Sequence, residues 1–197
     1  MLARFRQESA AIGAPYAFDE WGWLAYAQHH RVPTRLLDWS QSPLVALYFA
    51  SEEPAGRPAL EPDGELFLLH PSALNTAAGD NNGGHPRLLA ESEQKLHDYL
   101  PSRNNEPSMP RAVIAPLSFD RIRFQTGTFT LEQRPSGRDG DEPLRDSNAI
   151  QRILIPGPSK AGIREELEIL GFNEVSIYRD LDRIGKRIAD TGARRTL

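Results

Sequence analysis

The chain has 197 residues, of which 39% are hydrophobic and 25% charged, and its formal net charge is −4. These proportions suit a folded protein with a sizeable core, and the negative balance argues against general electrostatic binding to nucleic acid. The lack of cysteine excludes disulfides and thiolate chemistry. No apolar run approaches the roughly 20 residues of a membrane-spanning helix, and none forms a signal-peptide core. We therefore expect a cytoplasmic protein without a membrane partner.

The first pattern in the chain predicts a helix over residues 20–30. Asp19 precedes it as a candidate N-cap, and Pro33 ends it because the residue before a proline is pushed into extended geometry. Gln28 continues the inward face with an amide, and a buried amide without partners costs about 1–3 kcal/mol. We therefore expect Gln28 to bond neighbouring backbone or to line a pocket. The other members of that face are Trp21, Leu24 and Ala25.

A second helix is predicted to start at Ser42-Pro43, where a capping hydroxyl precedes a proline at the first helical position. Residues 32–41 then form a short ordered loop between two packed helices, a place where binding residues often lie. Two interpretations of Arg35 and Asp38 remain open. They form a local ion pair that fixes the loop, or Arg35 is held so that its planar fork meets a phosphate or carboxylate.

Strands alternate with insertions in the rest of the chain. Residues 71–87 and 132–149 are rich in turn formers or charged side chains, and we expect flexible insertions there. Helices, then strands, then helices indicate an α+β fold with a small mixed, mainly antiparallel sheet and helices packed on it. Strands are predicted at 64–70, 113–115, 128–131 and 150–156, and helices at 88–100, from 158 or 159 to a C′ residue at Gly171, and at 181–188.

Three blocks carry a resemblance to a known family. They are QHHRVPTRLLDWSQSPLVALYFA at residues 28–50, RIRFQTGTFT at 121–130 and VSIYRDLDRIGKRI at 175–188. In this order they resemble the signature blocks of the FRG domain family, which is mainly bacterial and phage-borne. The resemblance implies one FRG-like domain over residues 1–197. The Phe-Arg-Gly tripeptide that names the family is absent, so the chain resembles a member that lacks its N-terminal strand.

The polar side chains of the first two blocks form the candidate site. No metal site is expected, because HExxH and other ligand spacings are missing, and GxSxG, Walker and GxGxxG motifs are missing as well. Residues 111–134 hold four arginines against two acids, which favours a nucleotide or other anionic ligand. Arg121 and Arg123 have a second interpretation, in which their stems cover strand edges. The predicted ligand-binding residues are Gln28, His29, His30, Thr34, Arg35, Asp38, Arg121, Arg123, Thr128 and Thr130.

Two functions remain open for this set. An aromatic-Arg-Gly strand also occurs in ADP-ribosyltransferases, so the family resemblance implies a nucleotide-handling domain or an NAD-dependent transferase, with NAD as its cofactor. Gln125 and Glu132 would then be catalytic, Glu132 stabilising an oxocarbenium-like ribose. Nicotinamide would stack on Trp39, Tyr48 or Phe129. The alternative is a non-catalytic module that binds a nucleotide, nucleic acid or a partner protein. A hydrolase with His29 or His30 as general base rests on the histidines alone.

Overall fold

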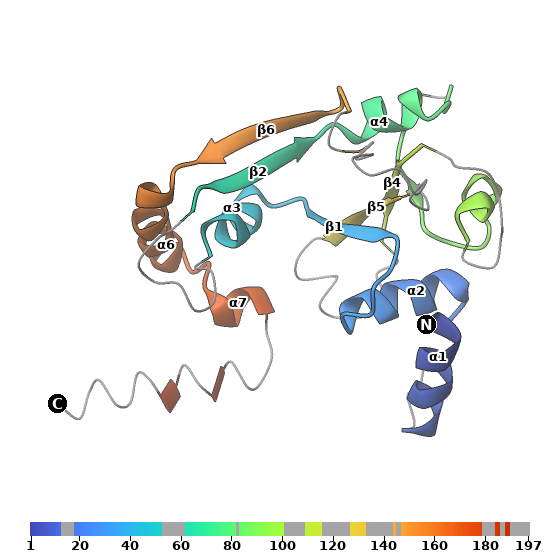
Figure 1. Ribbon diagram of the computed structural model, residues 1–197, viewed down its shortest axis with the longest axis horizontal. Coiled ribbons are helices and arrows are strands. Elements are labelled where there is room, and N and C mark those ends of the chain that lie inside the picture. Colours follow the sequence, from blue (N-terminus) through green and yellow to red (C-terminus); the bar gives the residue numbers. More distant parts are fainter. Residues whose placement is uncertain are drawn as a thin grey trace. The chain divides into compact units, whose positions relative to one another are not determined.

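The computed structural model describes residues 1–12, 18–52, 62–81, 83–100, 109–115, 127–132, 144, 147–178, 184–185 and 188–189. The chain divides into two compact units (Figure 1). The first comprises Met1–Trp39, Leu69–Ser118 and Gly127–Gln151, and the second comprises Ser40–Leu68, Phe119–Thr126 and Arg152–Leu197. Helices accompany a mixed, mostly antiparallel sheet, which confirms the predicted α+β class.

The first unit begins with two helices, α1 (Leu2–Ala11) and α2 (Glu20–His29), which pack against each other. Helix α2 starts as predicted, because the Asp19 carboxylate accepts a hydrogen bond from the Gly22 N–H at 2.6 Å. The predicted inward face is buried at Trp21, Leu24 and Ala25, while Gln28 is half-buried at its end.

A four-stranded sheet follows in the first unit, with the order β1 (Leu36–Ser40), β5 (Gly127–Leu131), β4 (Arg111–Ile114), β3 (Arg87–Leu88). Strand β4 pairs antiparallel with β5, placing Val113 opposite Phe129, and parallel with β3. The prediction of a loop over residues 32–41 is wrong for β1. That segment becomes a strand because β5, distant in sequence, pairs with its backbone.

Helix α4 (Pro71–Ala77) lies in a segment predicted to be an irregular insertion. It is capped by His70, whose Nδ1 accepts a hydrogen bond from the Ala73 N–H at 3.2 Å, and histidine is not among the strongly preferred cap residues. Its Asn75 is buried and bonds both backbone groups of Ala112, at 3.0 and 2.8 Å. Helix α4 is therefore fixed to β4. Its Leu74 forms a core cluster with Ala112, Leu144 and Ala149.

The remaining predictions for the first unit are met in part. The helix predicted over 88–100 is limited to a 3-10 helix, η1 (Gln94–Tyr99). The insertion predicted over 132–149 lies largely outside the described residues.

The second unit contains the capped helix α3 (Pro43–Ser51), in which Ser42 Oγ accepts a hydrogen bond from the Val45 N–H at 3.4 Å, as predicted. Helix α3 packs against α6 (Lys160–Ile169), and the Arg164 guanidinium donates to the Ser51 carbonyl at 2.7 Å. Strands β2 (Gly64–Leu69) and β6 (Ile150–Ile155) run side by side, mainly in this unit (Figure 1). The described part of this unit also contains the 3-10 helix η2 (Gly157–Ser159) and helix α7 (Glu174–Tyr178).

The C-terminal predictions have different outcomes. Gly171 ends α6 with φ +83°, the left-handed conformation expected of a C′ glycine. The helix predicted over 181–188 lies mostly outside the described residues.

Across the ranges that the structure describes, no helix combines the length and the apolar character that crossing a bilayer requires.

Two glycines with positive φ, Gly79 and Gly84, provide a matched test of the packing of α4. A Cβ on Gly84 would lie 2.1 Å from the Ser72 carbonyl oxygen, whereas a Cβ on Gly79 would have nothing within 4 Å. Both alanine variants carry the backbone cost of about 1–2 kcal/mol. We expect Gly84→Ala to lower the free energy of unfolding by about 1–3 kcal/mol more than Gly79→Ala, measured by urea denaturation. Equal losses would contradict the close approach of α4 to Gly84.

Candidate functional site

Gln28 joins the end of α2 to β1 through its side-chain amide. Its Oε1 accepts a hydrogen bond from Thr34 Oγ1 at 2.5 Å, and its Nε2 donates to Asp38 Oδ2 at 3.1 Å. Thr34 Oγ1 also accepts from the Leu36 N–H at 3.1 Å. The amide therefore bonds neighbouring side chains, and three of the predicted residues form one connected polar patch. Asp38 is its exposed member.

Arg35 is half-buried and is contacted at both its side chain and its backbone. Its Nη1 donates to the Tyr99 carbonyl at 3.5 Å, a long hydrogen bond. Its own carbonyl accepts from the Glu132 N–H at 2.8 Å. The guanidinium is thus positioned by η1, and the backbone of Arg35 meets the residue that follows β5.

The first two sequence blocks meet along β1 and β5, which are neighbours in the sheet. Besides the Arg35–Glu132 bond, Trp39 Nε1 donates to Thr130 Oγ1 at 3.0 Å. Trp39 also packs against the Leu74 core cluster. Parts of the chain about ninety residues apart are therefore held together by both backbone and side-chain bonds.

Several candidates on β5 turn out to be packing residues. Thr130 has no solvent exposure and Phe129 is 3% exposed, so neither side chain can contact a ligand in this structure. Thr128 is half-buried, and its hydroxyl donates to the Val113 carbonyl. Thr130 and Phe129 therefore serve the packing of the sheet. Arg121, Arg123 and Gln125 lie outside the described residues.

The two histidines belong to an aromatic cluster between α1 and α2. The exposed His30 ring lies edge-on to Tyr26, 4.6 Å between centroids, and edge-on to His29 at 5.0 Å. Phe5 of α1 lies 6.0 Å from His30. Among the residues that the structure describes, no three His, Asp or Glu side chains gather closely enough to hold a metal ion.

Tyr48, a stacking candidate, belongs to the second unit, where its ring lies edge-on to Tyr178.

Asp80 is a buried carboxylate that the sequence did not single out. Its side chain is 3% exposed and lies 2.9 Å from Lys95 Nζ, 3.8 Å from Arg87 Nε and 3.9 Å from Arg111 Nη1. The hydrogen bond from Lys95 lowers the pKa of Asp80 more than burial raises it, and the charges of Lys95, Arg87 and Arg111 lower it further. In the sequence, Asp80 stands in an Asn- and Gly-rich run that suggests only a turn.

A line of contacts leads from this charge cluster to Arg35. Arg111, beside Asp80, donates through Nε to the Tyr99 hydroxyl at 3.0 Å, and that hydroxyl donates to the Met109 carbonyl at 2.6 Å. The Tyr99 carbonyl accepts the hydrogen bond from Arg35. Tyr99 therefore contacts Arg111 through its hydroxyl and Arg35 through its carbonyl, which links the charge cluster to the Arg35 guanidinium.

Comparison with known proteins bears out the resemblance seen in the sequence. The FRG domain family matches residues 1–57, a range that contains the first block and helices α1, α2 and α3. The second and third blocks lie beyond the matched range. Neither a curated protein nor a solved structure matches the chain.

The lowered pKa of Asp80 makes the stability of the fold pH-dependent. Because the pKa is lower in the folded state than its ordinary value of 3.8, the stabilisation is present above that value and is lost as the pH falls from about 4 through the lowered pKa. We expect Asp80→Asn to lower the free energy of unfolding by about 1–3 kcal/mol at neutral pH and to weaken its fall in acid, measured by denaturant titrations across pH.

Glu65→Gln is the control for Asp80→Asn. Glu65 pairs with Arg152 at 3.0 Å, but their side chains are 32% and 59% exposed, and such surface pairs contribute about 0–1 kcal/mol. An Asp80→Asn loss no larger than that of Glu65→Gln would show that the buried cluster does not stabilise the fold.

Proposed function

We propose that this chain, which matches the FRG domain over residues 1–57, is a nucleotide-handling protein whose first unit binds NAD or a related nucleotide beside Arg35. The observation that carries the proposal is the hydrogen bond from the Glu132 N–H to the Arg35 carbonyl, at 2.8 Å. This bond joins the backbones of two residues whose side chains suit a nucleotide, since the guanidinium of Arg35 suits a phosphate and the carboxylate of Glu132 suits developing positive charge.

Arg35 supplies the anion-binding group in this proposal. Its planar fork matches phosphate oxygens bidentately. Its contact with the Tyr99 carbonyl holds the side chain before ligand arrives, which reduces the conformational freedom lost on binding. Nearby, the exposed carboxylate of Asp38 can accept hydrogen bonds from ribose hydroxyls, and its bond to Gln28 fixes its orientation.

Glu132 supplies the catalytic group. In ADP-ribosyl transfer, the bond between ribose C1′ and the nicotinamide nitrogen breaks, and nicotinamide leaves with the bonding electron pair. A nucleophilic nitrogen or oxygen of the acceptor bonds to C1′ and releases its proton. The ribose carries positive charge between these events, and a carboxylate at that point lowers the barrier. Gln125, proposed to orient the ribose with Glu132, lies outside the described residues.

The second candidate function is a non-catalytic module that binds a nucleotide, a nucleic acid or a partner protein through the same surface. Both ends of the Gln28 amide bond to protein groups, at 2.5 and 3.1 Å, and Thr130 is buried. Fewer polar groups can therefore take part in chemistry than the sequence indicated. Binding by Arg35 needs only a held guanidinium, whereas transfer also needs Glu132 to reach the ribose.

Nucleotide binding is tested with Arg35 variants. We expect NAD and ADP-ribose to raise the melting temperature of the wild-type chain, and Arg35→Gln to weaken their affinity at least tenfold, which is about 1.4 kcal/mol. Arg35→Lys should be intermediate because it keeps the charge but not the fork. Isothermal titration calorimetry measures each affinity. Arg4→Gln is the control, since the Arg4 side chain is 84% exposed and pairs with Glu8 on α1. No binding of either nucleotide by the wild-type chain would refute the proposal.

The catalytic step is tested with Glu132→Gln, which keeps the shape of the side chain and removes its charge. We expect this variant to retain NAD affinity while nicotinamide release falls about 10²–10³-fold, measured by chromatography of the reaction products with and without acceptor. If the wild-type chain binds NAD but releases no nicotinamide, the transferase is excluded and the binding module is favoured.

A further inference from the structure

Arg31 occupies a backbone position that normally belongs to glycine. Helix α2 ends in a Schellman motif, in which the Val32 N–H donates to the Ala27 carbonyl and the Arg31 N–H donates to the Gln28 carbonyl, both at 3.0 Å. This places Arg31 at C′ with φ +61°, and it is the one residue other than glycine with positive φ in the described ranges. Glycine, or sometimes asparagine, is usual at C′ because the left-handed conformation crowds a Cβ.

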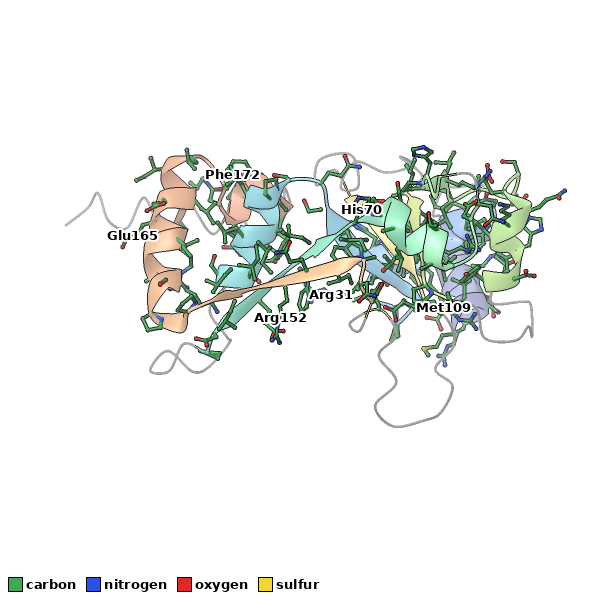
Figure 2. All side chains as sticks on the ribbon, turned by 90° about the horizontal axis from the view of Figure 1, so that it is seen from above. Arg31, His70, Met109, Arg152, Glu165 and Phe172 are labelled. Carbon is green, nitrogen blue, oxygen red and sulfur yellow. The ribbon has the colours of Figure 1, made fainter. Side chains whose placement is uncertain are left out.

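The side chain of Arg31 makes no contact in the described part of the chain that would offset the cost of its left-handed backbone conformation. It is exposed to solvent, and Figure 2 labels its place in the chain. Within the part of the chain that the structure describes, its guanidinium makes no hydrogen bond or ion pair. Residues held in sparsely populated backbone regions cluster at functional sites, so the position calls for a role outside the folded chain.

The loop that carries Arg31 leads directly to Arg35. The hydrogen bond between Thr34 Oγ1 and Gln28 Oε1, at 2.5 Å, closes the base of the loop, and Arg31 stands midway between these two residues. Residues 28–38 contain two arginines against a single acid, Asp38. The positive charge of Arg31 is therefore presented from a closed, ordered loop within the same block as Arg35.

We infer that Arg31 is a second anion-binding residue, which contacts a phosphate of the nucleotide diphosphate that Arg35 binds. This inference rests on the proposed nucleotide binding and adds to it a residue that sequence patterns did not indicate. A diphosphate offers separate oxygens to two guanidinium groups, and the left-handed turn directs Arg31 out of the helix, where it is open to solvent.

The test combines stability and affinity in Arg31→Gly. We expect the urea midpoint to rise, because glycine adopts positive φ without strain, while the affinity for ADP-ribose falls at least fivefold at low ionic strength. The fall should shrink at high ionic strength, where salt screens the lost attraction. Arg31→Lys, which keeps the charge, should retain most of the affinity. Arg31→Asn, which tolerates the left-handed conformation, should lose it as glycine does.

The outcomes separate this inference from the proposed function. If wild-type chain binds ADP-ribose and Arg35→Gln weakens it, but Arg31→Gly does not, the role of Arg31 is overturned and nucleotide binding stands. If the wild-type chain binds no ADP-ribose, both fall together. A lower urea midpoint for Arg31→Gly would show that the arginine serves the fold, and would also overturn the inference.

Discussion

The pairing of β1 with β5 is the constraint on which the first unit depends. It brings the connector after α2 against a strand that follows ninety residues later, and it buries Leu36 and Leu131. A one-residue slip would turn every side chain of β1 to the opposite face. The Trp39–Thr130 bond opposes such a slip, since a shifted β1 would leave a buried hydroxyl without its partner.

Buried polar side chains fix further segments of the first unit to this sheet. Asn75 satisfies both backbone groups of Ala112, and Asp80 draws Lys95, Arg87 and Arg111 to one point. Burying a carboxylate is unfavourable unless it is paired, so the three cations that make the burial of Asp80 favourable also fix how their segments are arranged. Through Arg111 and Tyr99 the arrangement extends to Arg35. A chain of contacts therefore connects the buried carboxylate to the group that would bind the ligand.

Local signals in the sequence predicted the elements that local chemistry determines. Asp19 and Ser42 accept the capping bonds expected of them, and Gly171 ends α6 in the left-handed conformation. Strand β1 was missed because its pairing depends on β5, and α4 was missed because a histidine caps it. The Asp80 cluster could not be predicted, since its four members gather only after α4, η1 and β4 have packed. Of the candidate site, the sequence indicated that the Gln28 amide needs partners, but those partners are the side chains of Thr34 and Asp38 and not the backbone groups expected. The burial of Thr130 depends on the sheet.

In the proposed function, the fixation of the candidate groups is what would make binding selective. An exposed arginine on a flexible loop loses much side-chain entropy when it grips an anion, whereas Arg35 is already restrained by η1. The loop before it is closed by the Gln28–Thr34 bond, and its apex is held in one backbone state at Arg31. Restraint of this kind raises affinity without enlarging the contact area. In the proposed function, the affinity for a nucleotide diphosphate would therefore come from the restraint of a few charged groups.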